Sequence, residues 1–175
     1  MTTGSFEENA DTLLTHMSLH EDLCLLNDHI HKYTTWLADH DRWLEWKALL
    51  TADTVFEYVT PKHSHNFRGT KEMFQTWGAL VKCCQNNRHV LSNRNFEVAP
   101  DKKTAMRNTN GLFAQVFESA KPNEHYMHGD NYQWEFVKMF DGWKTRRTPL
   151  EVICEHCRDM MDEVVADVTE AQNVR

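Results

Sequence analysis

The sequence predicts an α+β domain in which helices come first and a large antiparallel sheet follows. Apolar residues recur at helical spacing in the first half of the chain, whereas the second half holds long β-branched and aromatic segments separated by turn residues. Helices grouped ahead of a strand meander favour α+β over alternating βαβ units. The 175 residues fit one domain with a sizeable core. We expect this domain over 21–155, between a flexible arm over 1–20 and a tail or short helix over 156–175.

The helices are expected in the first half of the chain. Apolar stripes at three- and four-residue spacing predict helices over 23–37 and 42–50, and a third helix that begins at 70. A β-branched and aromatic segment over 54–59 predicts a strand, which a loop over 62–66 joins to the third helix.

Four long strands are expected in the second half, over 89–98, 104–117, 126–139 and 143–153. Turn residues separate them, and Asp141-Gly142 is the strongest hairpin signal. These strands predict an antiparallel meander.

Composition and charge exclude several classes of protein. The net charge of −7 argues against a nucleic-acid partner, which requires a basic face. No apolar run approaches the ~20 residues of a membrane span. Five scattered cysteines give no disulfide framework and suit a reducing compartment. We therefore expect a cytoplasmic protein without a membrane partner.

Short motifs follow one another in a recognisable order: Asp-x-Asp at 39–41 before a Trp pair, Tyr58 before Pro61, Arg68-Gly69, Asn87-Arg88-His89-Val90 and Asp141-Gly142-Trp143-Lys144. In this order the chain resembles the SnoaL-like branch of the nuclear-transport-factor-2-like superfamily. That branch includes polyketide cyclases, scytalone-type dehydratases and isomerases of fungal secondary metabolism. The resemblance covers residues 23–153 and implies a cone-shaped curved antiparallel sheet wrapped round the N-terminal helices, with a pocket inside.

His89 is the first candidate for chemistry. By resemblance it matches the His that scytalone-type dehydratases place at the start of the first long strand. Imidazole titrates near neutrality and can both take and give a proton. The alternative is a core or surface histidine without a catalytic role, one of eleven in the chain.

Glu135 is the second candidate. Its role depends on which face of its strand meets the pocket. Side chains alternate along a strand, so one face carries Asn131, Gln133 and Glu135, and the other Tyr132, Trp134 and Phe136. The resemblance places the polar face toward the substrate, where desolvation makes a carboxyl group a usable acid or base. We expect Glu135 to transfer protons and Asn131 and Gln133 to bind substrate. The alternative leaves this face in water.

Arg42 and Tyr58 are expected to act on a substrate oxygen. Arg42 lies between the first two helices, where a guanidinium can orient a carbonyl or stabilise an oxyanion. A phenol such as Tyr58 can donate to a substrate oxygen in an apolar site. A solvated arginine and a strand tyrosine with a wet hydroxyl are the alternatives. Scytalone-type dehydratases hold a Tyr-Asp pair near this junction, whereas this chain has Asp41-Arg42, which disfavours a strict dehydratase.

Phe113, Phe117 and Trp77 are expected to hold apolar rings of a substrate, with core packing as the alternative. The dehydratases place a His near the position of Phe113, and no His occurs there in this chain. This second departure also disfavours a strict dehydratase.

Metal and cofactor motifs are missing from the sequence. Cys154-Glu155-His156-Cys157 is half of a zinc site without a second half. No GxGxxG, Walker or GxSxG motif occurs. We expect neither a metal nor a cofactor.

The favoured function is a cofactor-free isomerase or cyclase that acts on a polycyclic natural-product intermediate in secondary metabolism, with Glu135 and His89 as proton-transfer groups. One alternative is a scytalone-type dehydratase, whose product is lighter by one water. Another is a non-catalytic, dimeric ligand-binding or scaffold protein, favoured if Glu135 faces solvent and side chains fill the cone. We expect a homodimer, and in the non-catalytic alternative Tyr132, Trp134 and Phe136 supply its interface.

Overall fold

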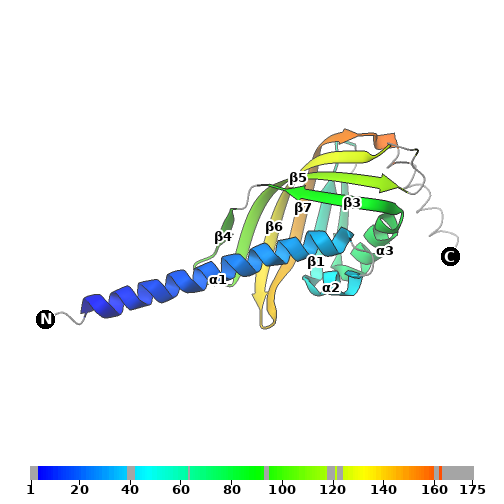
Figure 1. Cartoon of the computed structure of the whole chain (residues 1–175). Helices are drawn as coiled ribbons and strands as arrows, with labels where there is room; N and C mark the ends of the chain where they lie inside the picture. Colours follow the sequence, from blue (N-terminus) through cyan, green and yellow to red (C-terminus); the bar gives the residue numbers. More distant parts are fainter. Residues whose placement is uncertain are drawn as a thin grey trace.

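The computed structural model describes residues 4–38, 42–62, 64–92, 95–117, 121, 124–159 and 162. Helices pack against one face of a large curved sheet, so the α+β prediction is confirmed (Figure 1). The elements are α1 (Gly4–Ala38), α2 (Trp43–Ala48), β1 (Leu50–Val59), β2 (Ser64–Arg68), α3 (Gly69–Lys82), β3 (Cys84–Leu91), β4 (Phe96–Val98), β5 (Thr104–Phe117), β6 (Tyr126–Met139) and β7 (Gly142–His156).

The sheet has seven strands in the described part of the chain, in the order β2-β1-β7-β6-β5-β3, with β4 beside β5. All neighbours are antiparallel except β1 and β7, which are parallel. Two differences from the predicted strands stand out. The segment 62–66, expected to be a loop, contributes to β2, and the single strand expected over 89–98 is divided into β3 and β4.

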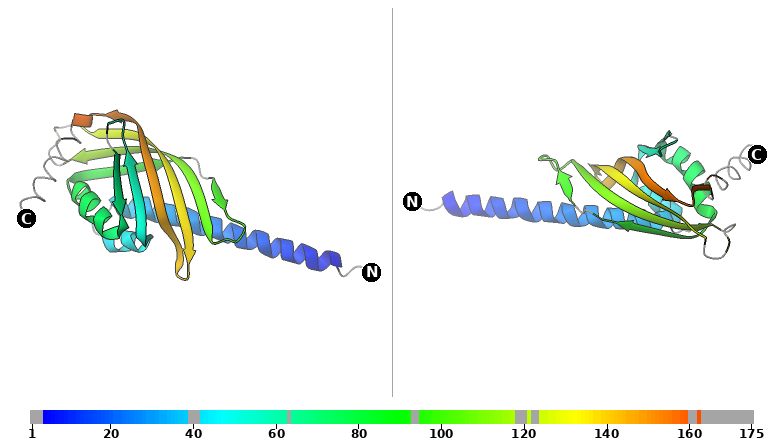
Figure 2. Two further views of the ribbon diagram at one scale, coloured as in Figure 1. Left: turned by 180° about the vertical axis from the view of Figure 1, so that it is seen from behind. Right: turned by 90° about the horizontal axis from the view of Figure 1, so that it is seen from above.

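The register of β6 and β7 shifts twice, between Gly129 and Asp130 and between Glu135 and Phe136. Such irregularities bend a strand and increase its twist. They lie in the longest hairpin of the sheet and contribute to its curvature round the helices (Figure 2).

Helix α1 is longer than the sequence predicts. The arm expected over 1–20 is helical from Gly4 onward and continues without a break into the predicted first helix. The C-terminal half of α1 lies on the sheet, where Leu26 and Tyr33 are buried. The N-terminal half extends past the edge of the sheet, and Leu13 and Met17 are each 61% exposed (Figures 1 and 2).

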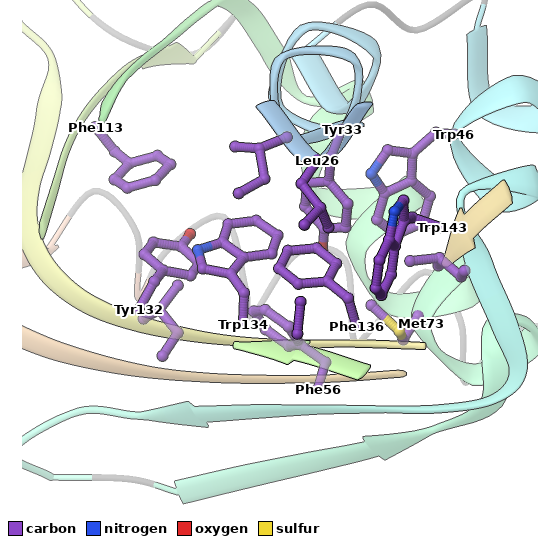
Figure 3. Close-up of a cluster of buried hydrophobic side chains, with 14 of the residues drawn as sticks. Leu26, Tyr33, Trp46, Phe56, Met73, Phe113, Tyr132, Trp134, Phe136 and Trp143 are labelled. Carbon is purple, nitrogen blue, oxygen red and sulfur yellow. The ribbon is translucent and has the colours of Figure 1, made fainter. Parts of the chain in front are cut away.

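Aromatic side chains fill the space between the helices and the sheet (Figure 3). Tyr132, Trp134 and Phe136 point from β6 into this core, and the ring of Tyr33 on α1 meets Trp134 edge-on at 4.8 Å. The prediction that these three β6 residues form a dimer interface is therefore wrong. The three residues occupy alternate positions of β6, so all three face the helices. Their burial there removes a large apolar surface from water.

Buried polar contacts fix α1 against the β6–β7 hairpin. Asp22 Oδ1 accepts hydrogen bonds from Lys138 Nζ at 2.6 Å and from Trp143 Nε1 at 3.0 Å. The Nε2 atom of His29 lies 2.8 Å from Thr145 Oγ1. Most of the expected tail over 156–175 lies outside the described residues. No helix in the described residues has the length and apolar character needed to cross a membrane.

Candidate functional site

Three neighbouring strands place a row of rings on the inner face of the sheet. The antiparallel register sets His89 on β3 opposite Phe113 on β5, and Phe113 opposite His128 on β6. The ring of His89 meets Phe113 edge-on at 4.4 Å, and the ring of His128 stacks on Phe113 at 4.9 Å. The register thus brings two imidazoles to opposite sides of one phenyl ring.

His128 and Asp130 form a buried pair at the centre of this region. They lie two residues apart on β6, so both side chains project to the inner face. His128 Nδ1 lies 2.6 Å from Asp130 Oδ1, and both residues are less than a tenth exposed. Burial raises the pKa of Asp130, and the hydrogen bond from His128 opposes that rise. The pair therefore joins an imidazole by a short hydrogen bond to a carboxyl group whose pKa is raised.

Several buried polar atoms near the pair lack a hydrogen-bond partner among the described residues: Asp130 Oδ2, His89 Nδ1, Asn87 Oδ1 and Gln115 Oε1. Burying such atoms without partners is costly, and protein interiors rarely leave them so. Burial, with a contribution from His128, lowers the pKa of His89 to about 3. His89 is therefore neutral at physiological pH, and its buried Nδ1 atom has no partner among the described residues.

Tyr58 reaches the same region from β1 through a chain of hydrogen bonds. Its hydroxyl is hydrogen-bonded to that of Tyr126, and Tyr126 donates to Glu155 Oε1 at 2.7 Å. Glu155 Oε2 lies 2.6 Å from Arg158 Nη1. Burial raises the pKa of Tyr58, and the charge of Asp130 adds to that rise. Tyr58 therefore stays protonated and can serve as a hydrogen-bonding group beside Asp130.

A hollow of ≈ 430 Å³ opens between α1 and the β3–β5 edge of the sheet, and His89 is part of its wall. Arg107 also lines it, is 4% exposed, and holds its guanidinium carbon 5.0 Å from the centre of the Phe96 ring. The other lining residues are Asn27, Asp28, Ile30, His31, Thr34 and Leu91. Ile30 and Leu91 are the apolar members of this lining, so the hollow is more polar than most ligand pockets.

Glu135 lies on the opposite face of the sheet from His89. Its Oε1 atom is 2.8 Å from Arg147 Nη1, and the same guanidinium binds Glu57 at 2.8 Å. Because the aromatic residues of β6 face the helices, the alternating polar residues must face outward. The expected orientation of this strand is therefore reversed, and the structure does not bring Glu135 to His89.

Asn131 and Gln133 share this outer face with Glu135. Asn131 Oδ1 accepts a hydrogen bond of 2.6 Å from Asn110 Nδ2 on β5. Both residues line a second hollow of ≈ 650 Å³ on the outer face, separate from the row of rings. The structure does not bring these two predicted binding residues to His89 either.

The remaining predicted residues are distributed over the molecule. The Arg42 side chain is 44% exposed, and its Nε lies 3.5 Å from Glu45 Oε1, so it is not part of the inner cluster. Residues 39–41 beside it lie outside the described residues. Phe117 is buried on the inner face of β5, as Phe113 is. Trp77 belongs to α3, but its side chain lies outside the described part of the structure.

His128 and Asp130 were not among the predicted site residues, although the alternation of β6 contains them. The inward-facing series Tyr132, Trp134 and Phe136, extended backward in steps of two, gives Asp130 and His128. The alternation is present in the sequence, but it identifies His128 and Asp130 as inward-facing only once the aromatic face is known to point inward.

The inner cluster can bind and transfer protons. It combines a carboxyl–imidazole pair, a neutral imidazole and a protonated phenol in an apolar setting, as acid/base sites require. Within the described residues, no group of three or more His, Cys, Asp or Glu side chains is arranged to hold a metal ion.

Known proteins share this fold. No curated protein matches the chain at a significant level. A candidate scytalone dehydratase from Novosphingobium aromaticivorans is 19% identical with a TM-score of 0.64, covering 84% of this chain and 90% of its own. A ketosteroid isomerase-like protein from Erwinia carotovora atroseptica is 14% identical with a TM-score of 0.61, covering 77% of this chain and 98% of its own.

A third solved structure, also from Novosphingobium aromaticivorans, is an NTF2-like protein with a cystatin-like fold. It is 18% identical with a TM-score of 0.63, covering 81% of this chain and 88% of its own. The model of the SnoaL-like domain family matches residues 26–148, which include α2, α3, the complete β1–β6 series and most of the inner cluster. The chain belongs to the SnoaL-like domain family.

Proposed function

We propose that this protein is a cofactor-independent isomerase or cyclase that moves a proton within a polycyclic natural-product intermediate of secondary metabolism. The observation that carries the proposal is the buried His128–Asp130 contact of 2.6 Å, with Asp130 Oδ2 and His89 Nδ1 unpaired in the described part of the chain. The SnoaL-like family and its isomerase-like and dehydratase-like neighbours support the same class of chemistry.

In the proposed reaction, Asp130 holds His128 by its Nδ1 atom, which leaves Nε2 to meet the substrate. His128 takes a proton from a carbon next to a carbonyl, and the electron pair moves onto the carbonyl oxygen to form an enolate. Neutral His89 donates a hydrogen bond to that oxygen through its ring N–H, while Tyr58, whose O–H donates to Tyr126, orders the hydroxyl chain beside it. His128 then returns the proton to a different carbon, so the double bond moves and no atom is lost.

The apolar surroundings suit a ring system. Phe113 lies between the two imidazoles, and Tyr132 lies 5.5 Å from Phe113 between ring centres. Excluding water strengthens each hydrogen bond to the developing enolate. Phe113 keeps its expected role as a binding residue. The His128–Asp130 pair takes over the proton transfer that was expected of Glu135.

Exchange of carbon-bound hydrogen tests the proposal without knowledge of the natural substrate. α-Tetralone and larger fused-ring ketones are incubated with the protein in D₂O, and NMR follows deuterium entering beside the carbonyl. We expect the protein to accelerate this exchange and His128→Gln to reduce the acceleration about 10²-fold or more. Glu135→Gln, on the outer face of the same strand, is the matched control and should retain it. Exchange no faster than in buffer would contradict the proposal.

A dehydratase is the second candidate, and one observation favours it. The sequence lacks a histidine at the position of Phe113, but His128 stacks on Phe113 from the neighbouring strand. The inner cluster therefore holds a second imidazole next to Phe113, contributed by the neighbouring strand. The mass of the product separates the two reactions, because dehydration removes one water and isomerisation leaves the mass unchanged.

A non-catalytic binding protein is the third candidate, and the outward position of Glu135 favours it. The unpaired polar atoms of the inner cluster favour catalysis, because a binding site for a purely apolar ligand does not require them. A homodimer and a cytoplasmic location stay predictions.

A further inference from the structure

The projecting half of α1 carries an apolar stripe that no part of the described domain covers. Leu13 and Met17 are each 61% exposed, Leu14 is 63% exposed, and His20 and Cys24 are also exposed. Lys102, in the turn between β4 and β5, reaches the carbonyl of Thr15 at 3.4 Å, and α1 continues from there to Gly4 (Figures 1 and 2). Exposed apolar side chains gathered in this way indicate an interaction surface.

The spacing of the stripe is that of a coiled coil. Leu13, Met17, His20 and Cys24 follow one another at intervals of four, three and four residues, which are the a and d positions of a heptad repeat. In the sequence, Phe6 and Ala10 continue the same intervals toward the N-terminus. A seven-residue repeat keeps one seam facing a partner helix along the whole segment.

The stripe lies on the side of α1 that faces away from the sheet. Asp22 and Leu26 are buried against the domain, and Cys24 is two residues from each of them. At 3.6 residues per turn, two residues correspond to a rotation of about 200° round the helix axis. A second helix can therefore lie along the stripe while each domain stays on the outer side of its own helix.

The heptad spacing favours a second copy of this chain as the occupant, and the charge of the segment argues against a membrane. The first 31 residues contain six acidic residues and no Lys or Arg, so an anionic membrane would repel the segment. A heptad seam is self-complementary, because equivalent a and d residues pack in shared layers. In a parallel pair, His16 at a g position lies beside Glu21 of the second copy at an e position.

We propose that α1 forms a parallel, in-register two-stranded coiled coil over residues 13–24 with a second copy of this chain. The seam consists of Leu13, Met17, His20 and Cys24 from each copy. An isolated helix of this length is only marginally stable in water, and the second copy supplies the packing that stabilises it. This assembly is independent of the inner cluster and of the proposed reaction.

Sedimentation equilibrium of the full-length chain tests the seam with two neighbouring substitutions. Leu13→Glu places a charge in the seam, and Thr12→Glu adds the same charge one residue away, outside the seam. We expect self-association of the unmodified chain, weakened at least about tenfold by Leu13→Glu and unchanged by Thr12→Glu. A monomer at every concentration, or equal association by all three proteins, would overturn the proposal. Circular dichroism of each variant shows whether the domain remains folded.

Cross-linking tests the direction and register of the pair. In a parallel, in-register seam, Cys24 of one copy faces Cys24 of the other, within reach of a short bismaleimide. We expect a cross-linked dimer whose peptides join Cys24 to Cys24, and no such species from Cys24→Ser. Cross-links that join only other cysteines would overturn the parallel arrangement.

Discussion

His128 Nδ1 and Asp130 Oδ1 lie 2.6 Å apart on the inner face of β6, and Phe113 covers the imidazole ring. The pair depends on three features of the strand. Alternation sends both side chains inward, the register with β5 sets Phe113 against His128, and burial holds the pKa of Asp130 above its usual value. In water, an aspartate at the same distance from a histidine would not have its pKa raised in this way.

Replacing Asp130 by Asn should separate activity from stability. Asn cannot carry the charge that orients and supports His128, so the proposed hydrogen exchange should fall about 10²-fold or more. In the unmodified protein the exchange should decline as pH falls through the raised pKa of Asp130. Protonation of the base His128 still stops exchange in Asp130→Asn, so an acidic decline remains there, but the part that reports Asp130 should be lost and the midpoint of the decline should move. The pH–rate profile of each protein measures the difference.

The same substitution should not destabilise the fold at neutral pH. A carboxyl whose folded pKa is raised contributes stability at low pH, and this stability is lost as pH rises through that pKa. Removing the buried charge should therefore leave the free energy of unfolding at pH 7 unchanged or increased, as urea denaturation would show. A large loss of stability would identify the pair as structural.

Gly111→Ala should disturb the row of rings. A Cβ atom at Gly111 would lie 2.5 Å from Phe113 Cε2 and 3.3 Å from Leu91 Cδ2, so the Phe113 ring must move. We expect a cost of about 1–3 kcal/mol and a shift of the His128 ring signals in NMR spectra, because the stacked phenyl ring is displaced.

Gly78→Ala on α3 is the control for this substitution, since no atom lies within 4 Å of the added Cβ. It should stabilise the protein by about 0.5–1 kcal/mol through the higher helix propensity of Ala. Unchanged His128 signals in Gly111→Ala would contradict the arrangement of rings described above.

Buried His29 should make the fold sensitive to mild acid. Burial lowers its pKa from 6.5 to about 4 in the folded protein. Between these values the unfolded chain binds a proton that the folded protein does not, so the free energy of unfolding decreases as pH falls from 6.5 to 4. The contribution is roughly 3 kcal/mol. Urea denaturation at several pH values should show a shallower decrease for His29→Gln, and an unchanged slope would argue against a neutral buried imidazole.

Asp22 should contribute more to the free energy of unfolding than an exposed carboxylate on the same helix. Asp22→Ala leaves the buried indole N–H of Trp143 without its acceptor and should cost about 3 kcal/mol. Asp28 pairs with Lys32 at the surface, with side chains 52% and 42% exposed. Asp28→Ala should therefore cost about 0.5 kcal/mol or less. Equal losses in denaturant titrations would contradict the anchoring role of Asp22.

The sequence determined the order of helices and strands because periodicity and turn residues are local properties. The α+β class, the long strands and the helix that packs Leu26 and Tyr33 on the sheet all follow from it. Short β2 was missed, since a strand beside β1 is recognisable only through its partner. The extension of α1 to Gly4 was missed because polar residues there weaken the helical pattern.

Tertiary structure decided which face of each strand meets the helices. The sequence showed that β6 has one polar and one aromatic face. The alternation alone does not say which of the two faces points toward the helices. Packing chose between them: burying Trp134 and Phe136 against α1 removes far more apolar surface from water than burying Glu135 would, and Arg147 is available outside to pair with Glu135. That choice turned Asp130 and His128 inward, beside His89, and so assembled the candidate site.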